Sequence, residues 1–218
     1  MSRPLPSKFN NGAIVLGHYK TAQVSGAIAA TPTALDHWAR IRWVPSQAGA
    51  KLVLTRLACG LSVSGAVTTA IQFTLDASIG RNFSVDHTTA CTKLNLSGGI
   101  GRMSASFPAS QMGTSGPGIA TTAPCTGQTV TLDDPFAIQD FPLITAVTAT
   151  GTAIALPVGV ASGVKDLYRW DGNGEHPPTL TSGEGVIVRC VLTGHATGTL
   201  TLRTVWEWAE VINPFGND

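Results

Sequence analysis

One loop-like stretch, LYRWDGNGEHPP at residues 167–178, holds the side chains best suited to bind a ligand. Aromatic rings offer flat apolar faces on which a sugar ring can stack, and neighbouring carboxylate and amide groups can hydrogen-bond to its hydroxyl groups. Tyr168, Trp170, Asp171 and Asn173 supply both kinds of group within a short span. They form a candidate carbohydrate-binding site.

The same stretch begins like a calcium loop, because DGNGE at residues 171–175 places oxygen-bearing side chains between glycines. A calcium loop also needs Gly at its sixth position and Glu at its twelfth. This chain has His176 and Ser182 at those positions. We therefore expect an Asp and Gly turn there, with no bound metal.

No other group of residues has the spacing of a catalytic or cofactor site. Asp133 and Asp134 resemble a carboxylate pair, but adjacent residues of a strand point to opposite faces, so we expect a solvated turn. The glycines of GGIGRM do not complete a phosphate-binding fingerprint, and no G-x-S-x-G motif occurs. The scattered histidines have no ligand partner at metal spacing; they are His18, His37, His87, His176 and His195. We expect no catalytic residues, no cofactor, no metal and no enzyme activity.

The four cysteines stand far apart, without a C-x-x-C motif that would indicate a zinc or redox site. Cys59 and Cys190 lie in apolar strand candidates, where a free cysteine is commonly a small buried hydrophobic residue. Cys91 and Cys125 lie in a loop-rich region, and the sequence leaves open whether they form a bridge. A reducing compartment would not favour one.

The composition excludes several classes of partner. Charged residues make up 12% of the chain, about half the usual share, and the formal net charge is +1. No basic run is present that could neutralise a nucleic-acid backbone. No apolar stretch is long enough to span a membrane, and the N-terminus lacks the apolar core of a signal peptide, so we expect synthesis in a cytoplasm. A weakly charged surface also favours assembly, because little like-charge repulsion keeps the copies apart.

The elements that must position these residues are strands. HWARIRWV at residues 37 to 44 alternates unlike side chains with a period of two. Two apolar, β-branched segments follow at 51–63 and 66–78, with a Gly-marked turn between them, and the three segments predict a meander. Strand candidates return at 137–149 and 152–161, where Pro142 and Pro157 favour edges or strand ends.

The last two apolar runs, at residues 186–192 and 200–208, predict a hairpin. In the second run, Trp206 and Trp208 share one face, and large aromatic side chains close a core when the last strand is central. We expect these tryptophans to meet those of HWARIRWV across paired strands, with Arg40 or Arg42 facing Glu207.

These segments together predict an all-β fold, an antiparallel β-sandwich of roughly eight strands with jelly-roll or Greek-key topology. The predicted organisation is an extended N-terminal arm at 1–36, a single sandwich domain at 37–211 with a long loop-rich excursion at about 80–132, and a C-terminal tail at 212–218. A short edge strand at residues 13 to 17 is an alternative within the arm. The Gly, Ser, Thr and Pro content of the excursion favours turns.

The closing segment resembles that of a group of tailed-bacteriophage virion proteins. The similar residues are GEG at 183–185, the small-residue turn at 194–198 and the terminal WAEV at 208–211. RLACGLSVSGAVTTAIQFTLDAS, RMSASFPASQMG and TLDDPFA resemble the middle of those proteins in the same order, so the resemblance covers residues 37 to 211.

The resemblance implies a non-enzymatic structural component of a bacteriophage particle, a head decoration, cementing or minor capsid protein. Its implied partners are the major capsid protein or other virion proteins and further copies of itself, with a symmetric trimer favoured because linked sites act at high effective concentration. It implies location in the virion after synthesis in the host bacterial cytoplasm, with no direct nucleic-acid or membrane contact. The alternative is a carbohydrate-binding sandwich that recognises a host or surface through Tyr168, Trp170, Asp171 and Asn173.

Overall fold

A computed structural model gives the fold of the chain. It describes residues 14–28, 37–64, 71–84, 91–93, 100–104, 106, 108–112, 117–121, 125, 129–144, 153–154, 164–172, 176–193 and 199–212. These residues form strands, bridges and turns, and none of them is helical.

Eight strands pair in a nested order. The first pairs with the last, β1 with β14, and then come the pairs β2 with β13, β3 with β11 and β4 with β9, all of them antiparallel. A chain paired in this way is one long hairpin. The strands are β1 (Ile14–Val24), β2 (His37–Arg42), β3 (Ala50–Ser64), β4 (Ile71–Arg81), β9 (Ala137–Ile144), β11 (Lys165–Arg169), β13 (Gly185–Thr193) and β14 (Thr199–Ile212).

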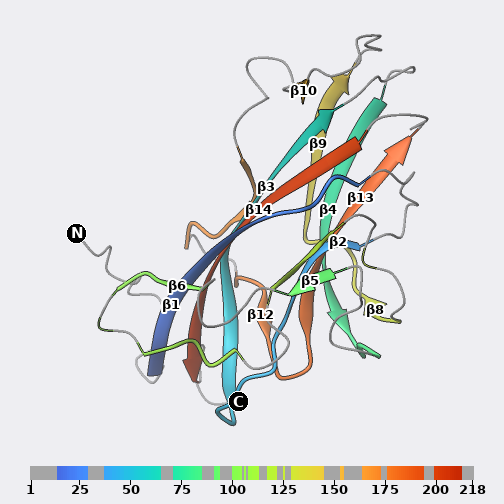
Figure 1. Cartoon of the computed structure of the whole chain (residues 1–218). Helices are drawn as coiled ribbons and strands as arrows, with labels where there is room; N and C mark the ends of the chain where they lie inside the picture. Colours follow the sequence, from blue (N-terminus) through green and yellow to red (C-terminus); the bar gives the residue numbers. More distant parts are fainter. Residues whose placement is uncertain are drawn as a thin grey trace.

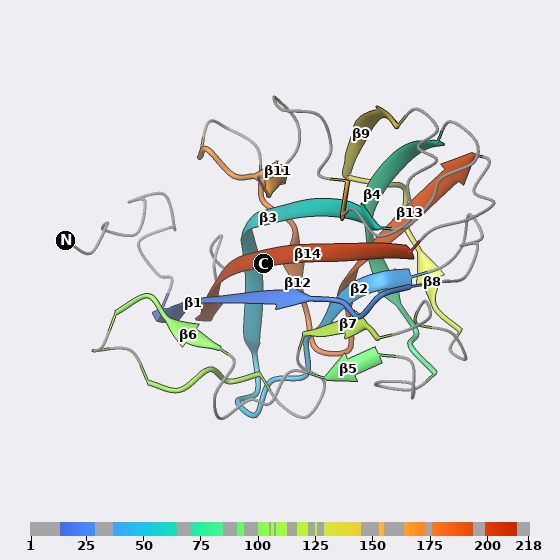
Figure 2. The same cartoon turned by 45° about the horizontal axis from the view of Figure 1, so that its top comes forward.

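The long hairpin is rolled into two packed sheets (Figures 1 and 2). The β14 sheet has the order β11, β3, β14, β1, and the β13 sheet has the order β9, β4, β13, β2. This is the strand order of a jelly roll, so the expected all-β sandwich is confirmed. Six short strands extend the sheets: β5 (Cys91–Lys93), β6 (Gly101–Arg102), β7 (Gly118–Ala120), β8 (Thr131–Leu132), β10 (Ala153–Ile154) and β12 (Thr179–Leu180).

Two predicted local pairings are wrong. The run at 186–192 pairs with β2 and β4, whereas the run at 200–208 pairs with β3 and β1. The two runs therefore belong to different sheets and form no hairpin. The predicted meander fails in the same way, because β2 and β4 lie in one sheet and β3 in the other. In a jelly roll, the chain passes from one sheet to the other between successive strands. Alternation within a strand does not predict to which sheet the strand belongs.

The N-terminal prediction also needs correction. Residues 14 to 24 form β1, a full strand beside β14, where an arm or only a short edge strand was expected. The chain therefore does return its end beside its beginning, as a jelly roll requires, but it does so through β1. Residues 1–13 and 213–218 lie outside the described part of the chain.

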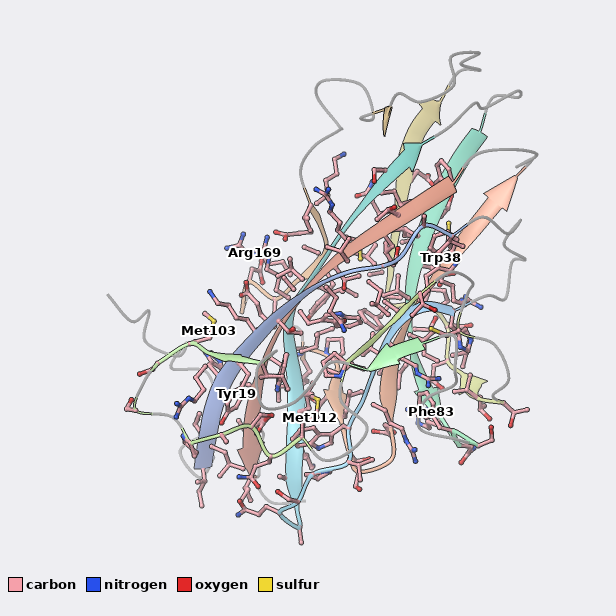
Figure 3. All side chains as sticks on the ribbon, in the orientation of Figure 1. Tyr19, Trp38, Phe83, Met103, Met112 and Arg169 are labelled. Atoms are coloured by element: carbon pink, nitrogen blue, oxygen red, sulfur yellow. The ribbon has the colours of Figure 1, made fainter. Side chains whose placement is uncertain are left out.

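The core lies between the two sheets and holds four of the tryptophans, each with no exposed surface. Figure 3 labels one of them, Trp38. Trp38 and Trp43 come from the β2 segment, and Trp206 and Trp208 come from β14. The two pairs thus share one core but lie on opposite sheets, so the predicted cross-strand meeting is wrong. Trp43 donates from Nε1 to the carbonyl oxygen of Ala50 at 2.9 Å, which satisfies its buried polar group.

The excursion between β4 and β9 extends both sheets. β6 pairs with β1 at the edge of the β14 sheet, β7 pairs with β2 at the edge of the β13 sheet, and β5 pairs with β7. Ile119 and Ala120 are buried, so this part of the excursion belongs to the core. Cys125 is disulfide-bonded, and its backbone N–H donates to the carbonyl oxygen of His37 at 2.7 Å.

Candidate interaction surfaces

The predicted sugar-binding residues lie at the end of β11. Tyr168 is half-buried, packs against the core, and meets the ring of Phe136 edge-on with 5.5 Å between ring centroids. Trp170 is half-buried, and its backbone N–H donates to the carbonyl oxygen of Thr55 at 2.9 Å. Asp171 is exposed. Asn173 lies outside the described residues.

These positions give a smaller platform than the sequence predicts. The Tyr168 ring is packed against Phe136 and the core, so a sugar would stack mainly on Trp170. Asp171 follows Trp170 directly and precedes Gly172, whose positive φ of 78° suits glycine. The structure therefore brings one partly exposed ring and one carboxylate together.

The outer face of the β14 sheet carries a row of alternating charges. Lys20 on β1 lies opposite Glu207 on β14, which in turn lies opposite Arg56 on β3. Arg56 donates to Glu207 at 3.0 Å and to Asp166 on β11 at 2.5 Å, and Arg169 lies 3.4 Å from Asp166. Glu207 therefore pairs with Arg56, and the predicted pairing with Arg40 or Arg42 is wrong.

Further cations make this face basic. Lys51 and Arg203 lie on it too, and among the described residues neither they nor Lys20 form an ion pair. Small or short side chains, such as those of Ala22 and Val24, separate the charges. Val24 is 60% exposed. The basic face, as we use the term, has five cations and two carboxylates, a formal charge of +3: Lys20, Lys51, Arg56, Arg169, Arg203, Asp166 and Glu207.

The far edge of the β13 sheet is acidic. Residues 131–140 run alongside β4 from β8 into β9, and the N–H groups of Asp133 and Phe136 bond to the β4 backbone at 2.9 Å. This segment, TLDDPFAIQD, has three aspartates and no cation. Asp134 and Asp140 are exposed, and between them Ile138 is 63% exposed. We call residues 131–140 the acidic edge.

One cation sits at the end of the acidic edge. Arg81 forms ion pairs with Asp133 and, at 2.8 Å, with Glu184 in the turn before β13. These hydrogen bonds raise the pKa of the Arg81 guanidinium, and they contribute to lowering the pKa of Glu184. Because Glu184 offsets Arg81, the region keeps a formal charge of −3.

A buried carboxylate fixes the excursion to the end of β14. Glu210 has no exposed surface and accepts hydrogen bonds from the Ser110 hydroxyl, from the Gln111 N–H at 2.7 Å and from Trp208 Nε1 at 3.1 Å. Burial raises the pKa of Glu210 despite these donors. The nearby Tyr19 hydroxyl donates to the carbonyl oxygen of Pro108 at 3.1 Å, and burial raises its pKa to about 12. Residues 108–112 are thus held against the sandwich.

The outer face of the β13 sheet is covered. Arg189 donates from two nitrogens to the carboxylate of Asp76 at 2.8 and 2.7 Å. Arg42 lies 5.4 Å from the centre of the Phe83 ring. Arg40 is fully buried, and burial, with a smaller effect of Arg42, lowers its pKa to about 10.

The described residues include no group of three or more His, Cys, Asp or Glu side chains placed to hold a metal. No helix long and apolar enough to cross a membrane occurs in the part of the chain that is described. Cys59 and Cys190 are free and buried, as expected, and burial raises the pKa of both thiols. Asp133 is held by Arg81, so Asp133 and Asp134 do not share one environment.

Alternation in the sequence did not predict either charged surface. The basic face combines residues from strands that are distant along the chain, and their neighbourhood depends on the jelly-roll order. Only the acidic edge has a local signal, three aspartates in ten residues. Comparisons with protein families, with curated proteins and with solved structures found no match for this chain.

Proposed function

We propose that this chain is a non-enzymatic structural component of a bacteriophage particle, which decorates or cements the capsid as a symmetric oligomer. The observation that carries the proposal is the eight-stranded jelly roll, a fold class used by viral capsid subunits and also by lectins. A fold alone does not define a function. The sequence resemblance therefore supplies the choice between these uses.

Two of the segments that carry the resemblance are in contact in this chain. RMSASFPASQMG at 102–113 and WAEV at 208–211 lie far apart in the sequence, and Glu210 joins them through Ser110 and Gln111. Two segments that resemble the phage proteins thus meet at one buried contact.

Capsid binding suits the described surfaces. A sandwich with a charged face can contact a shell through many weak interactions, and oligomerisation multiplies them by raising the effective concentration of each site. The major capsid protein or another virion protein is the proposed partner. The proposed location is the virion, after synthesis in the bacterial cytoplasm.

The carbohydrate-binding alternative rests on Trp170 and Asp171 at the end of β11. Because Tyr168 packs on Phe136, this site has a single accessible stacking ring, and the structural role is the better-supported proposal. A glycan array tests the alternative. Binding that Trp170→Ala abolishes, in a chain that does not bind capsids, would favour it over the structural role.

Reconstitution tests the proposal. Capsid shells of the encoding phage are assembled without this chain, mixed with the purified protein, and separated by sedimentation through a gradient. The proposal expects saturable co-sedimentation and shells that resist heat or dilution better than bare ones. Protein that stays at the top of the gradient at every concentration, with no effect on shell stability, would contradict it.

A further inference from the structure

The basic face and the acidic edge carry opposite formal charges of equal size, although the whole chain has a net charge of only +1. The basic face spans β1, β14, β3 and β11. The acidic edge follows β4 on the other sheet. Charges of a nearly neutral protein are thus separated onto two surfaces.

Within the described part of one copy, the two surfaces adjoin only where β11 meets the segment before β9, through the contact of Tyr168 with Phe136. Lys20 projects from β1 and Arg203 from β14, whereas Asp134 and Asp140 follow β4 at the far edge of the β13 sheet. Figure 2 places β8 and β9 beyond β4, away from β1. Contact of Lys20 and Arg203 with Asp134 and Asp140 therefore requires a second molecule.

Each surface also has one exposed apolar side chain among its charges. Val24 is 60% exposed and lies opposite Arg203 in the strand register. Ile138 is 63% exposed and lies between Asp134 and Asp140 in the sequence. An apolar contact inside a rim of paired charges is the usual make-up of a protein interface.

The acidic edge is unsuited to strand addition. Pro135 has no N–H group to offer, Pro142 within β9 has none either, and the exposed aspartates disfavour a paired strand. A partner can therefore contact the acidic edge through side chains and not through strand pairing. The basic face fits this requirement, because its exposed Lys20 and Arg203 can reach carboxylates on a neighbour.

We propose that the basic face of one copy binds the acidic edge of the next, with Lys20 and Arg203 against Asp134 and Asp140 and with Val24 near Ile138. The contact joins two different surfaces, so it is heterologous, and a rotation that closes it produces a ring. The inference rests on the proposed function for its symmetric oligomer. It names the surfaces that would build that oligomer.

Two double variants test the contact on the full chain without capsids. The face variant is Lys20→Glu with Arg203→Glu, and the edge variant is Asp134→Lys with Asp140→Lys. Native mass spectrometry and sedimentation velocity give the oligomeric state. We expect each variant alone to associate at least about tenfold more weakly than the wild type, since it opposes like charges. Circular dichroism checks that both remain folded.

Mixing the two variants gives the sharper result. The face variant keeps an intact acidic edge, and the edge variant keeps an intact basic face, so the mixture should form complexes that contain both chains. Labelling one variant with nitrogen-15 identifies such complexes by mass. The matched control, Lys20→Arg with Arg203→Lys, keeps the charges and should assemble like the wild type.

A wild type that stays monomeric at all concentrations would overturn the inference, and so would variants that assemble like the wild type. Two monomeric variants that fail to combine would also overturn it. These outcomes are separate from the capsid test. Self-association as described, without shell binding, would remove only the proposed function, and shell binding that the variants do not change would remove only this contact.

Discussion

Glu210 shows how a single residue secures a long excursion. Its carboxylate is buried in a chain with few charges, and it accepts hydrogen bonds from Ser110, Gln111 and Trp208. Removing an acceptor from several buried donors costs more than the hydrogen bonds themselves contribute, because the donors lose their partner without regaining water. The contact between the excursion and β14 should therefore depend on this residue.

Glu210→Ala should lower the free energy of unfolding by about 2 to 4 kcal/mol, because it leaves these donors without their acceptor. Urea denaturation followed by tryptophan fluorescence measures the loss. Glu207→Ala is the matched control, since Glu207 is a partly exposed carboxylate on the same strand, paired with Arg56. Its loss should stay below about 1 kcal/mol. Equal losses in the two variants would contradict the role given to Glu210.

The raised pKa of Glu210 gives a pH dependence with a definite sign. The folded state holds this proton more tightly than the unfolded state, so the residue's contribution to stability falls as pH rises through the folded pKa. Wild type should therefore gain stability relative to Glu210→Gln as pH is lowered from about 7 to about 4. Comparing the two proteins cancels other titrating groups, such as His18. A difference that is flat, or that grows with pH, would contradict this assignment.

At the scale of elements, β1 explains one failure of sequence reasoning. Its inward positions include Thr21 and Gln23, both buried, while Ala22 and Val24 point outward and are exposed. A strand with polar residues inside and apolar residues outside has the reverse of the usual pattern. The segment therefore has weak periodicity, which suggested an arm, although the strand is a full member of the sheet.

The other long strands show what alternation does predict. It assigned the faces of β14 correctly, with Trp206 and Trp208 inward and Arg203 and Glu207 outward. It also indicated a sandwich whose end returns beside its beginning. It did not identify the sheet to which each strand belongs, because the partner of a strand is set by long crossovers and by packing between the sheets. The position of each charged surface depends on the strand order, so alternation alone did not predict these surfaces.

Gly26 lies where the excursion packs against the end of β1, so a substitution at this residue tests that packing. Its N–H donates to the carbonyl oxygen of Ala120 at 3.3 Å, and a Cβ placed on it would lie 1.9 Å from the carbonyl oxygen of Thr121. Gly26→Ala should therefore lower the unfolding free energy by about 1 to 3 kcal/mol, since backbone must move.

Gly101→Ala is the control for Gly26→Ala. Gly101 lies in the excursion itself and is exposed, and its added Cβ would come no closer than 3.6 Å to Lys20. Its effect should stay within about 0.5 kcal/mol. Thermal denaturation compares the two, and a harmless Gly26→Ala would show that β1 and the excursion are not packed as described.

At the scale of the whole molecule, the segregation of charge should make assembly depend on salt. Exposed charges are screened within about 10 Å at 0.1 M salt, and more strongly at higher concentrations. Self-association through the basic face and the acidic edge should weaken by about tenfold or more between low and high salt. Sedimentation velocity across a salt series measures this. Tighter association at high salt would indicate an apolar contact elsewhere.

The proposed function makes the chain a part of an assembled particle. Quantitative mass spectrometry of gradient-purified particles from the encoding phage tests this claim most directly. We expect the chain in stoichiometric ratio to the major capsid protein, in a copy number that fits whole symmetric oligomers. Particles that are complete and infectious but contain none of this chain would contradict the account.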